Sequence, residues 1–172
     1  MIRLRELERS DVALITGWRH NRSLVEGLGA PFRFIGPEVD AAWFDTYLSR
    51  RGVDVRCAIC REEEAVPVGV ISLIGIDPVH RHAEFHILVG DAVPHGEGVG
   101  TEATKAMLRH GFLDLNLHRI YLYVLASNRA AIRVYEKAGF RHEGTLREAA
   151  FKGGTFQDVT VMAMLRSEFT AS

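Results

Sequence analysis

The chain of 172 residues has no excess of charge of either sign and little cysteine: 21 Lys and Arg stand against 22 Asp and Glu, and there are two cysteines. Neither half of the chain has the basic excess expected of a nucleic-acid-binding protein. No apolar run approaches the roughly 18 residues that a membrane-spanning helix needs, and residues 1–6 lack the apolar core of a signal peptide. We therefore expect a cytoplasmic protein that binds neither nucleic acid nor a membrane.

The two cysteines, Cys57 and Cys60, form a CxxC pair, a pattern that can mark half a zinc site or a redox centre. They lie in an extended-looking run, where side chains three positions apart point to opposite faces. No second Cys/His pair at ligand spacing follows. Three histidines within residues 80–86 also suggest a metal site, but two of them are expected in a turn. We therefore expect two small apolar residues in a strand, and no metal.

Hydrophobic periodicity predicts a strand, two helices, a run of strands, and then a helix, a strand, a helix and a β-hairpin. The hairpin is expected around Lys152-Gly153-Gly154, and Gly139 is expected to end the last helix as its C′ residue. This order predicts one domain, residues 1–172, of the α/β class. Its sheet is expected to be twisted, mixed and mostly antiparallel, with helices on its flanks.

Three local predictions depend on where capping and apolar residues fall. Ser10 is expected to cap the N-terminus of the first helix. The strand over residues 118–125 is apolar on both faces and is expected to be buried on both sides. The second helix, within residues 38–51, is expected to bury one face, formed by Trp43, Phe44, Tyr47 and Leu48.

Residues 94–103 place three glycines between a strand-like run and the start of a helical pattern. Glycine lets the backbone approach an anion closely and adopt positive φ. The N–H groups of a first helical turn are unpaired, and the helix dipole favours negative charge beside them. The stretch therefore predicts a cradle for the phosphate of a cofactor.

Two common nucleotide motifs fit this stretch poorly. Residues 98–103 match GxGxxG/A, but they follow hairpin-like strands, and no acidic residue stands about 20 positions on to hold a ribose. A Walker A loop needs a lysine before Thr101, and none is present. A nicotinamide enzyme is kept only as a rival.

Two signatures resemble the GNAT superfamily of N-acetyltransferases. Residues 95–100, His-Gly-Glu-Gly-Val-Gly, are similar to its Arg/Gln-x-x-Gly-x-Gly/Ala pyrophosphate loop, with His95 in place of the usual Arg or Gln. The run from Asn128 through Ala131 and Tyr135 to Gly139-Phe140 resembles its second signature. Matches to the ribosomal-protein and spermidine acetyltransferase branch extend over nearly the whole chain, at residues 83–85, 115–119, 143–147 and 158–162.

The resemblance implies a GNAT fold and direct acetyl transfer from acetyl-CoA, the co-substrate, to a primary amine. Because His95 carries no fixed charge at neutral pH, the backbone amides of the loop are expected to hold the pyrophosphate. The implied contacts to acetyl-CoA are Leu88, Val89, His95, Gly96, Glu97, Gly98, Val99, Gly100, Thr101, Asn128, Ala131 and Tyr135.

Acetyl transfer needs a neutral amine, although a free alkyl ammonium has a pKa near ~10.4, and it needs a stabilised or protonated thiolate leaving group. The resemblance makes Tyr135 the candidate acid; spacing alone also fits a tyrosine that packs on the sheet. Glu84 is the candidate base, directly or through water; the alternative is a surface glutamate paired with Arg81 or another charge. Asn128 is an N-cap by type and, by the resemblance, a contact to the pantetheine arm.

The acceptor is left open among a polyamine, a protein N-terminus, an amino sugar and an amino acid. Residues 79–140 look most like the spermidine enzymes, but Gly29-Ala30-Pro31 replaces an acidic pair of that family, and Gly75 stands near its next acidic position. A polycation needs carboxylates around it. Those that could compensate are Glu26, Glu38, Asp40 and Asp45.

A rival from another class is a CoA-binding or sensing module that has lost catalysis. The presence of both Asn128 and Tyr135 argues against such a loss. The apolar last strands could form the interface of a homo-oligomer.

Overall fold

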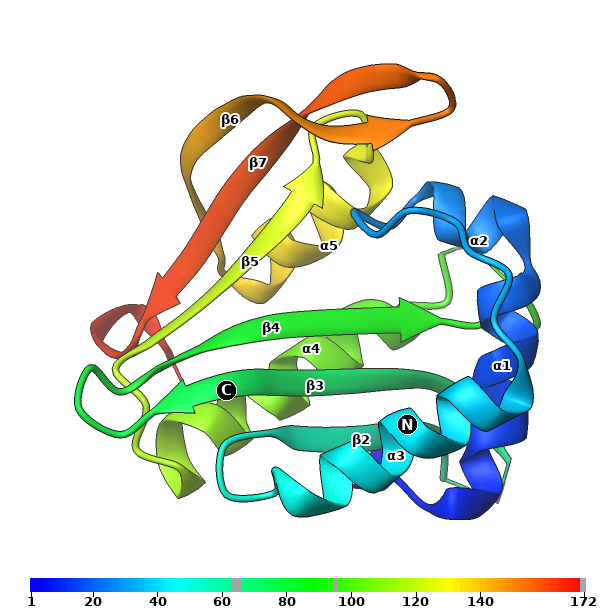
Figure 1. Cartoon of the computed structure of the whole chain (residues 1–172). Helices are drawn as coiled ribbons and strands as arrows, with labels where there is room; N and C mark the ends of the chain where they lie inside the picture. The colour runs from blue at the N-terminus through cyan, green and yellow to red at the C-terminus, as the bar shows by residue number, and fades with distance from the viewer. Residues whose placement is uncertain (63–65, 95, 171–172) are drawn as a thin grey trace.

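The structure is a computed structural model and describes residues 1–62, 66–94 and 96–170. Within these residues, seven strands form one sheet in the order β1-β2-β3-β4-β5-β7-β6, antiparallel except between β4 and β5 (Figure 1). The strands are β1 (Ile2–Glu6), β2 (Val55–Arg61), β3 (Pro67–Asp77), β4 (His82–Val89), β5 (Arg119–Leu125), β6 (Arg141–Lys152) and β7 (Thr155–Leu165). The helices are α1 (Val12–His20), α2 (Arg22–Glu26), α3 (Pro37–Ser49), α4 (Val99–Arg109) and α5 (Arg129–Ala138). The predicted α/β class and mostly antiparallel sheet are confirmed.

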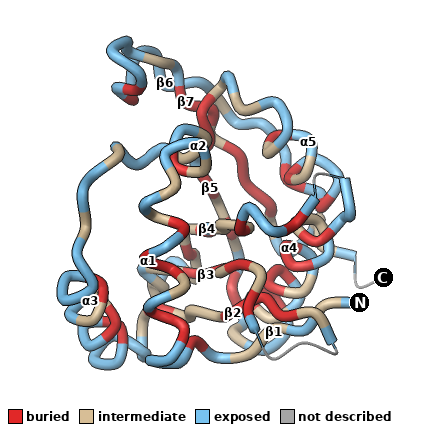
Figure 2. Tube along the Cα trace, turned by 90° about the vertical axis from the view of Figure 1, so that its right-hand side faces the viewer, coloured by how far each residue is buried: buried red, intermediate tan, exposed pale blue. Residues whose placement is uncertain are grey.

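Helices cover the sheet on two sides. Helices α4 and α5 lie behind it in Figure 1, and the main hydrophobic core fills the space between them and the strands. A second cluster lies between α1, α3 and the first strands, and includes Trp18, Phe44 and Tyr47. Figure 2 shows buried residues concentrated along the strands between these helical layers. No helix of the described ranges is long and apolar enough to cross a membrane.

Several turns follow their predicted chemistry. Gly139 has φ of 105° and ends α5, as a C′ glycine does. Gly153 and Gly154 both have positive φ in the turn between β6 and β7. Cys57 packs against the main core, whereas Cys60 is buried in the second cluster, so the two thiols point to opposite faces as expected. The described residues contain no cluster of three His, Cys, Asp or Glu side chains that could hold a metal ion.

Two local predictions were wrong. Ser10 does not cap the first helix: Asp11 closes the turn before α1, where its carboxylate accepts the Glu8 N–H at 2.8 Å and a bond from Arg5. Leu48 is 46% exposed, because the face of α3 that is buried carries Asp40, Phe44 and Tyr47. At the start of α1 and on α3, contacts with neighbouring elements determine which side chain is buried or bonded.

The prediction that β5 is buried on both faces was also wrong. Ile120, Leu122 and Val124 are buried beneath α4 and α5. On the other face Tyr123 is 50% exposed, and Leu125, at the end of the strand, is buried against Ala150 and Val159. The second core cluster reaches only the first four strands, so that face of β5 has no helix over it. An apolar pattern there marks an open aromatic surface instead of a second core.

Strands β4 and β5 pair over a short distance and then separate. Their parallel pairing comprises His82–Arg119, Ala83–Ile120 and Glu84–Tyr121. Beyond Glu84, β4 continues to Val89 and β5 continues to Leu125, and the two strands diverge in Figure 1. The edge of β4 that faces β5 therefore has no strand partner from Phe85 onward, which leaves backbone hydrogen-bonding groups for a ligand.

A buried carboxylate joins helices α1 and α3. Asp40 is fully buried, accepts the Thr16 hydroxyl at 2.7 Å and forms an ion pair with Arg19. The Arg19 side chain is 35% exposed, so water reaches one end of the pair. The contact fixes α3, and the segment that leads into it, against the body of the domain.

We expect Asp40→Ala to lower the free energy of unfolding by about 2–3 kcal/mol, because it leaves a guanidinium and a hydroxyl without their partner in a mostly buried contact. Urea denaturation followed by circular dichroism measures this. Asp45→Ala is the matched control. Asp45 lies on the exposed side of the same helix, α3, and pairs with Arg9, and both side chains are 58% exposed. Loss of this ion pair is expected to lower the free energy of unfolding far less. Equal effects for the two variants would contradict this assignment.

Candidate active site

The glycine-rich stretch forms the N-terminus of α4. Gly96 and Gly98 have φ of 98° and 81°, values that favour glycine, and Gly98 is the N-cap residue. No side chain of the described residues caps this end, and the first intrahelical bond runs from the Glu102 N–H to the Gly98 carbonyl. The amides of residues 99–101 are therefore free to bind an anion. His95 lies outside the described residues.

The carboxylates of the loop have partners of their own. Glu97 forms an ion pair with Arg61 at 2.6 Å, and Glu102 accepts the Ile2 N–H at 3.1 Å. Pairing reduces the repulsion that the charge of Glu97 would exert on a phosphate at the free amides. Val99 is buried and anchors the first turn of the helix, while Thr101 is half-buried. The residues present therefore fit the pyrophosphate of CoA.

The end of β4 lies beside this helix. A side chain at Gly100 would come within 4.0 Å of Val89 and 3.7 Å of Val134. Leu88 and Val89 are half-buried and belong to opposite faces of the sheet, Leu88 against the second cluster and Val89 against the main core. The region beside Gly100 is therefore bordered by three parts: the unpaired edge of β4, the free amides at the N-terminus of α4, and helix α5. A site for the CoA arm requires these parts to lie together.

Asn128 holds the N-terminus of α5 and a distant loop together. Its Oδ1 accepts the Ala131 N–H at 3.1 Å, which confirms the predicted N-cap. Its Nδ2 donates to the Gly27 carbonyl at 2.9 Å, in the segment after α2. One side chain therefore positions both the helix that carries Tyr135 and the loop in front of it. Its contact to pantetheine stays a prediction.

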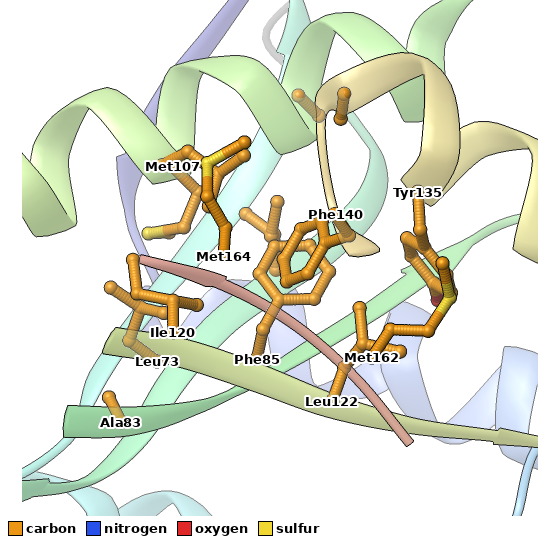
Figure 3. Packing of buried hydrophobic residues seen from close by; sticks show 14 of the residues in the cluster. Leu73, Ala83, Phe85, Met107, Ile120, Leu122, Tyr135, Phe140, Met162 and Met164 are labelled. Atoms are coloured by element: carbon orange, nitrogen blue, oxygen red, sulfur yellow. The ribbon is translucent and has the colours of Figure 1, made fainter. Parts of the chain in front are cut away.

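Tyr135 reaches from α5 toward the strands (Figure 3). Its ring meets Phe85 and Phe140 edge-on, with centroids 6.0 and 5.9 Å apart, and the residue is 8% exposed. Burial raises the pKa of Tyr135 to about 12, so the phenol keeps its proton at neutral pH. A protonated phenol at this place can donate to a developing thiolate.

Glu84 lies on the opposite face of β4 and pairs with His86, not with Arg81. The distance from His86 Nε2 to Glu84 Oε1 is 3.0 Å, whereas Arg81 donates its Nε–H to the Asn116 carbonyl. Burial of the imidazole lowers the pKa of His86, and the charge of Arg56 acts in the same direction, while Glu84 opposes them. The Glu84 and His86 side chains are 27% and 49% exposed, so a substrate can reach both.

The candidate acid and base therefore occupy opposite faces of the sheet at the point where β4 and β5 part. Phe85, which touches Tyr135, follows Glu84 directly in the strand, and successive side chains alternate between faces. A thioester held at this edge is open to the phenol from one side and to an amine from the other. The arrangement suits attack by an amine on a bound thioester.

Sequence reasoning missed four residues around this point. Tyr121 stands opposite Glu84 in the register, and Tyr123 is half-exposed on the same face. His86 was expected on the strand face of Glu84, but a role was considered for it only as a metal ligand, among the histidines of residues 80–86. Lys152, expected in a turn, is 7% exposed and donates its ammonium to the carbonyls of Val25 and Ala30 at 2.8 and 2.7 Å. Period-2 alternation could have indicated the first three; nothing local indicated the lysine.

The fold and the site have clear relatives. A family model described as an acetyltransferase (GNAT) domain matches residues 2–141. The spermidine N(1)-acetyltransferase of Vibrio cholerae serotype O1 is 32% identical over 169 residues, 96% of this chain and 94% of that protein. That of Escherichia coli K12 is 30% identical over 171 residues, 99% and 89% of the two chains. A crystal structure of spermidine N-acetyltransferase from Vibrio cholerae in complex with CoA and spermine has a TM-score of 0.89 at 30% identity, and the match covers 97% and 96% of the two chains.

The chain therefore belongs to the GNAT acetyltransferases. It is an enzyme that transfers an acetyl group from acetyl-CoA to an amine, and the fold, the class of reaction and the co-substrate expected from its motifs are confirmed. The rivals of a nicotinamide enzyme and of a module without catalysis are not supported. The roles of single residues in binding and catalysis stay predictions.

For Tyr135→Phe we expect kcat to fall about 10²-fold with little change in acetyl-CoA affinity, because only the proton donor is lost. Steady-state kinetics and calorimetric titration with acetyl-CoA measure the two quantities. Tyr47→Phe is the matched control: burial also raises the pKa of Tyr47 to about 12, but its hydroxyl donates to Glu6, on β1. An unchanged kcat in Tyr135→Phe would remove this residue as the acid.

Proposed function

We propose that the acceptor is a polyamine of the spermidine type, acetylated at a primary amine. The observation that carries this proposal is the similarity over nearly the whole chain to proteins named spermidine N(1)-acetyltransferase, and to one solved with CoA and spermine. Similarity over the full length includes α2, α3 and the last strands, which carry the acceptor side. A likeness limited to the CoA-binding half would not support this acceptor.

The open face of the sheet offers groups that attract an ammonium. Glu84 supplies a carboxylate, and Tyr121 and Tyr123 supply aromatic rings, which attract cations to their faces. The Tyr121 ring already has the Arg119 guanidinium 5.7 Å from its centroid. This surface supports binding of the amine that reacts.

The acidic residues that could hold a second positive charge of the amine fall into two groups, those that already pair with another residue and those that are exposed. Asp40 is buried in its contact with Thr16 and Arg19, and Asp45 pairs with Arg9, so neither is free. Glu26 and Glu38 are exposed at the two ends of the segment between α2 and α3. We assign the distant ammonium groups of the polyamine to these two carboxylates.

The acceptor side is closed by the segment after α2, which two side chains hold in place. Asn128 binds the Gly27 carbonyl, and Lys152 binds the carbonyls of Val25 and Ala30. These contacts attach the segment to α5 and to the β6–β7 hairpin, near the point where β5 ends. The amine therefore enters between this segment and the open face of β4 and β5, and transfer is direct because both substrates are bound together.

A panel of amines tests the proposal. Thiol release from acetyl-CoA is measured with spermidine, spermine, putrescine, glucosamine, a free amino acid and a peptide with an unblocked N-terminus. We expect kcat/KM for spermidine or spermine to exceed that for the amino sugar, the amino acid and the peptide at least tenfold, because only a polyamine uses the distant carboxylates. A higher value for the peptide or the sugar would show that the acceptor is wrong.

Lys152→Met is expected to raise KM for spermidine about tenfold, with the acetyl-CoA affinity unchanged. Its loss removes two hydrogen bonds from a charged donor to the segment that closes the acceptor side, and 1.4 kcal/mol corresponds to tenfold. Lys137→Met, at an exposed position of α5, is the control. If KM for acetyl-CoA rose instead, the segment would belong to the CoA side.

A further inference from the structure

We propose that His86 takes the proton from the substrate ammonium, and that Glu84 orients the imidazole as a positioning residue. The proposal rests on the proposed function, since it concerns the amine bound on the open face of the sheet. Its basis is a side-chain pair that the sequence did not reveal: His86 Nε2 lies 3.0 Å from Glu84 Oε1, and both side chains are open to solvent.

The hydrogen bond between the two residues decides which imidazole nitrogen is free. A carboxylate only accepts hydrogen bonds, so the proton of the neutral imidazole lies on Nε2, the atom beside Glu84. Nδ1 then carries the lone pair and can take a proton. The carboxylate stabilises the imidazolium that results, because an opposite charge at hydrogen-bond distance favours the charged form. This is the division of roles between histidine and carboxylate in a serine hydrolase triad.

The position along β4 favours His86 over Glu84 as the group nearest to the reaction. Glu84 is the last residue of β4 that pairs with β5, opposite Tyr121. His86 lies two residues further, on the same face, where β4 has left β5 and its edge is free for a ligand. Phe85, between them, contacts Tyr135 from the other face. The imidazole therefore lies beyond the paired part of the strand, beside the edge of β4 that no strand occupies.

Burial of the imidazole, together with the charge of Arg56, lowers the pKa of His86 against the opposing charge of Glu84. His86 stands opposite Ser72 of β3 in the register, and Ser72 stands opposite Arg56 of β2, so one row crosses three strands. Trp43 of α3 packs on the Arg56 guanidinium, with the ring centroid 5.0 Å away. The charged and titratable groups nearest the pair include Arg56 on β2, Tyr121 opposite Glu84 on β5, and His82, whose ring lies 5.7 Å from that of Tyr121. A positive charge in this row disfavours an imidazolium, and the pKa of His86 is lowered by burial in the same direction.

Imidazole is also the better base for this reaction. Its ordinary pKa of about 6.5 lies near neutral pH, where a general base is most effective, whereas a carboxyl group has an ordinary value of about 4. Between groups at their ordinary pKa values, transfer from an ammonium of pKa ~10.4 is therefore less unfavourable to an imidazole than to a carboxylate.

His86 Nδ1 takes one proton from the ammonium and later returns it to solvent. The neutral nitrogen forms a bond to the thioester carbonyl carbon, and the carbon–sulfur bond breaks. Tyr135 gives its proton to the sulfur, and the second proton that the nitrogen loses restores the phenol through solvent. The products are an amide, free CoA thiol and one proton.

The experiment compares pH profiles of kcat/KM for spermidine in the wild type, His86→Gln and Glu84→Gln. Glutamine at position 86 can still donate an N–H to Glu84 but does not titrate near neutral pH. We expect the wild type to lose activity as the pH falls through an ionisation below about 6.5, where the imidazole gains its proton. His86→Gln should lose this ionisation and at least 10²-fold in kcat/KM at pH 7. His142→Gln, at an exposed position of β6, is the control.

A second measurement does not depend on turnover. The His86 resonance is titrated by NMR in the wild type and in Glu84→Gln, and its pKa should fall in the variant, because the carboxylate that favours the imidazolium is gone. The proposal is overturned if His86→Gln keeps the acid limb and at least half of kcat/KM, or if Glu84→Gln alone abolishes that limb. If the wild type does not acetylate spermidine, the acceptor is wrong, and the same profiles are recorded with the best amine of the panel.

Discussion

The arrangement of the candidate site depends on the short pairing between strands β4 and β5. Strands β4 and β5 pair at three positions and then diverge, although each strand continues for several residues. A parallel sheet normally gains from continued pairing, and unpaired backbone groups are costly when they are buried. Here the free edge of β4 lies between α4, whose N-terminal amides have no partner within the helix, and α5, which carries the buried phenol of Tyr135. The backbone groups along this edge of β4 are therefore available to form hydrogen bonds with a substrate arm.

Around this point, burial acts in opposite directions on two groups that carry protons. On the helical side it raises the pKa of Tyr135 to about 12, which keeps the phenol protonated. On the open side, partial desolvation lowers the pKa of His86, whose side chain is 49% exposed, and this favours the neutral imidazole. The charged form is disfavoured in each case. One physical effect therefore favours the neutral form of a group on each face, the protonated phenol of Tyr135 and the unprotonated imidazole of His86.

The sequence predicted best what a few adjacent residues determine. Gly96 and Gly98 could be assigned to a turn with positive φ, Asn128 to an N-cap and Gly139 to a helix end, because each depends on local backbone chemistry. Predictions that depend on tertiary surroundings failed: Leu48 and Tyr123 are exposed, and no side chain of the described residues caps α1, Ser10 included. The pair of Glu84 with His86 and the bonds of Lys152 to a loop more than 120 positions away arise only when the chain folds. The site on the CoA side is mainly local in sequence, and the acceptor side is not.

This difference follows from how the two sides are built. The donor side comes from compact segments, the loop and first turn of α4 and the first turns of α5, whose shape their own backbone determines. The proposed acceptor side is a surface assembled from α2, the segment after it, two strands and the tip of a hairpin, and Lys152 and Asn128 connect these parts. Exchanging side chains on that surface leaves the free amides of α4 untouched. A family with this construction can change the amine that it recognises by single substitutions while it keeps one source of acetyl groups.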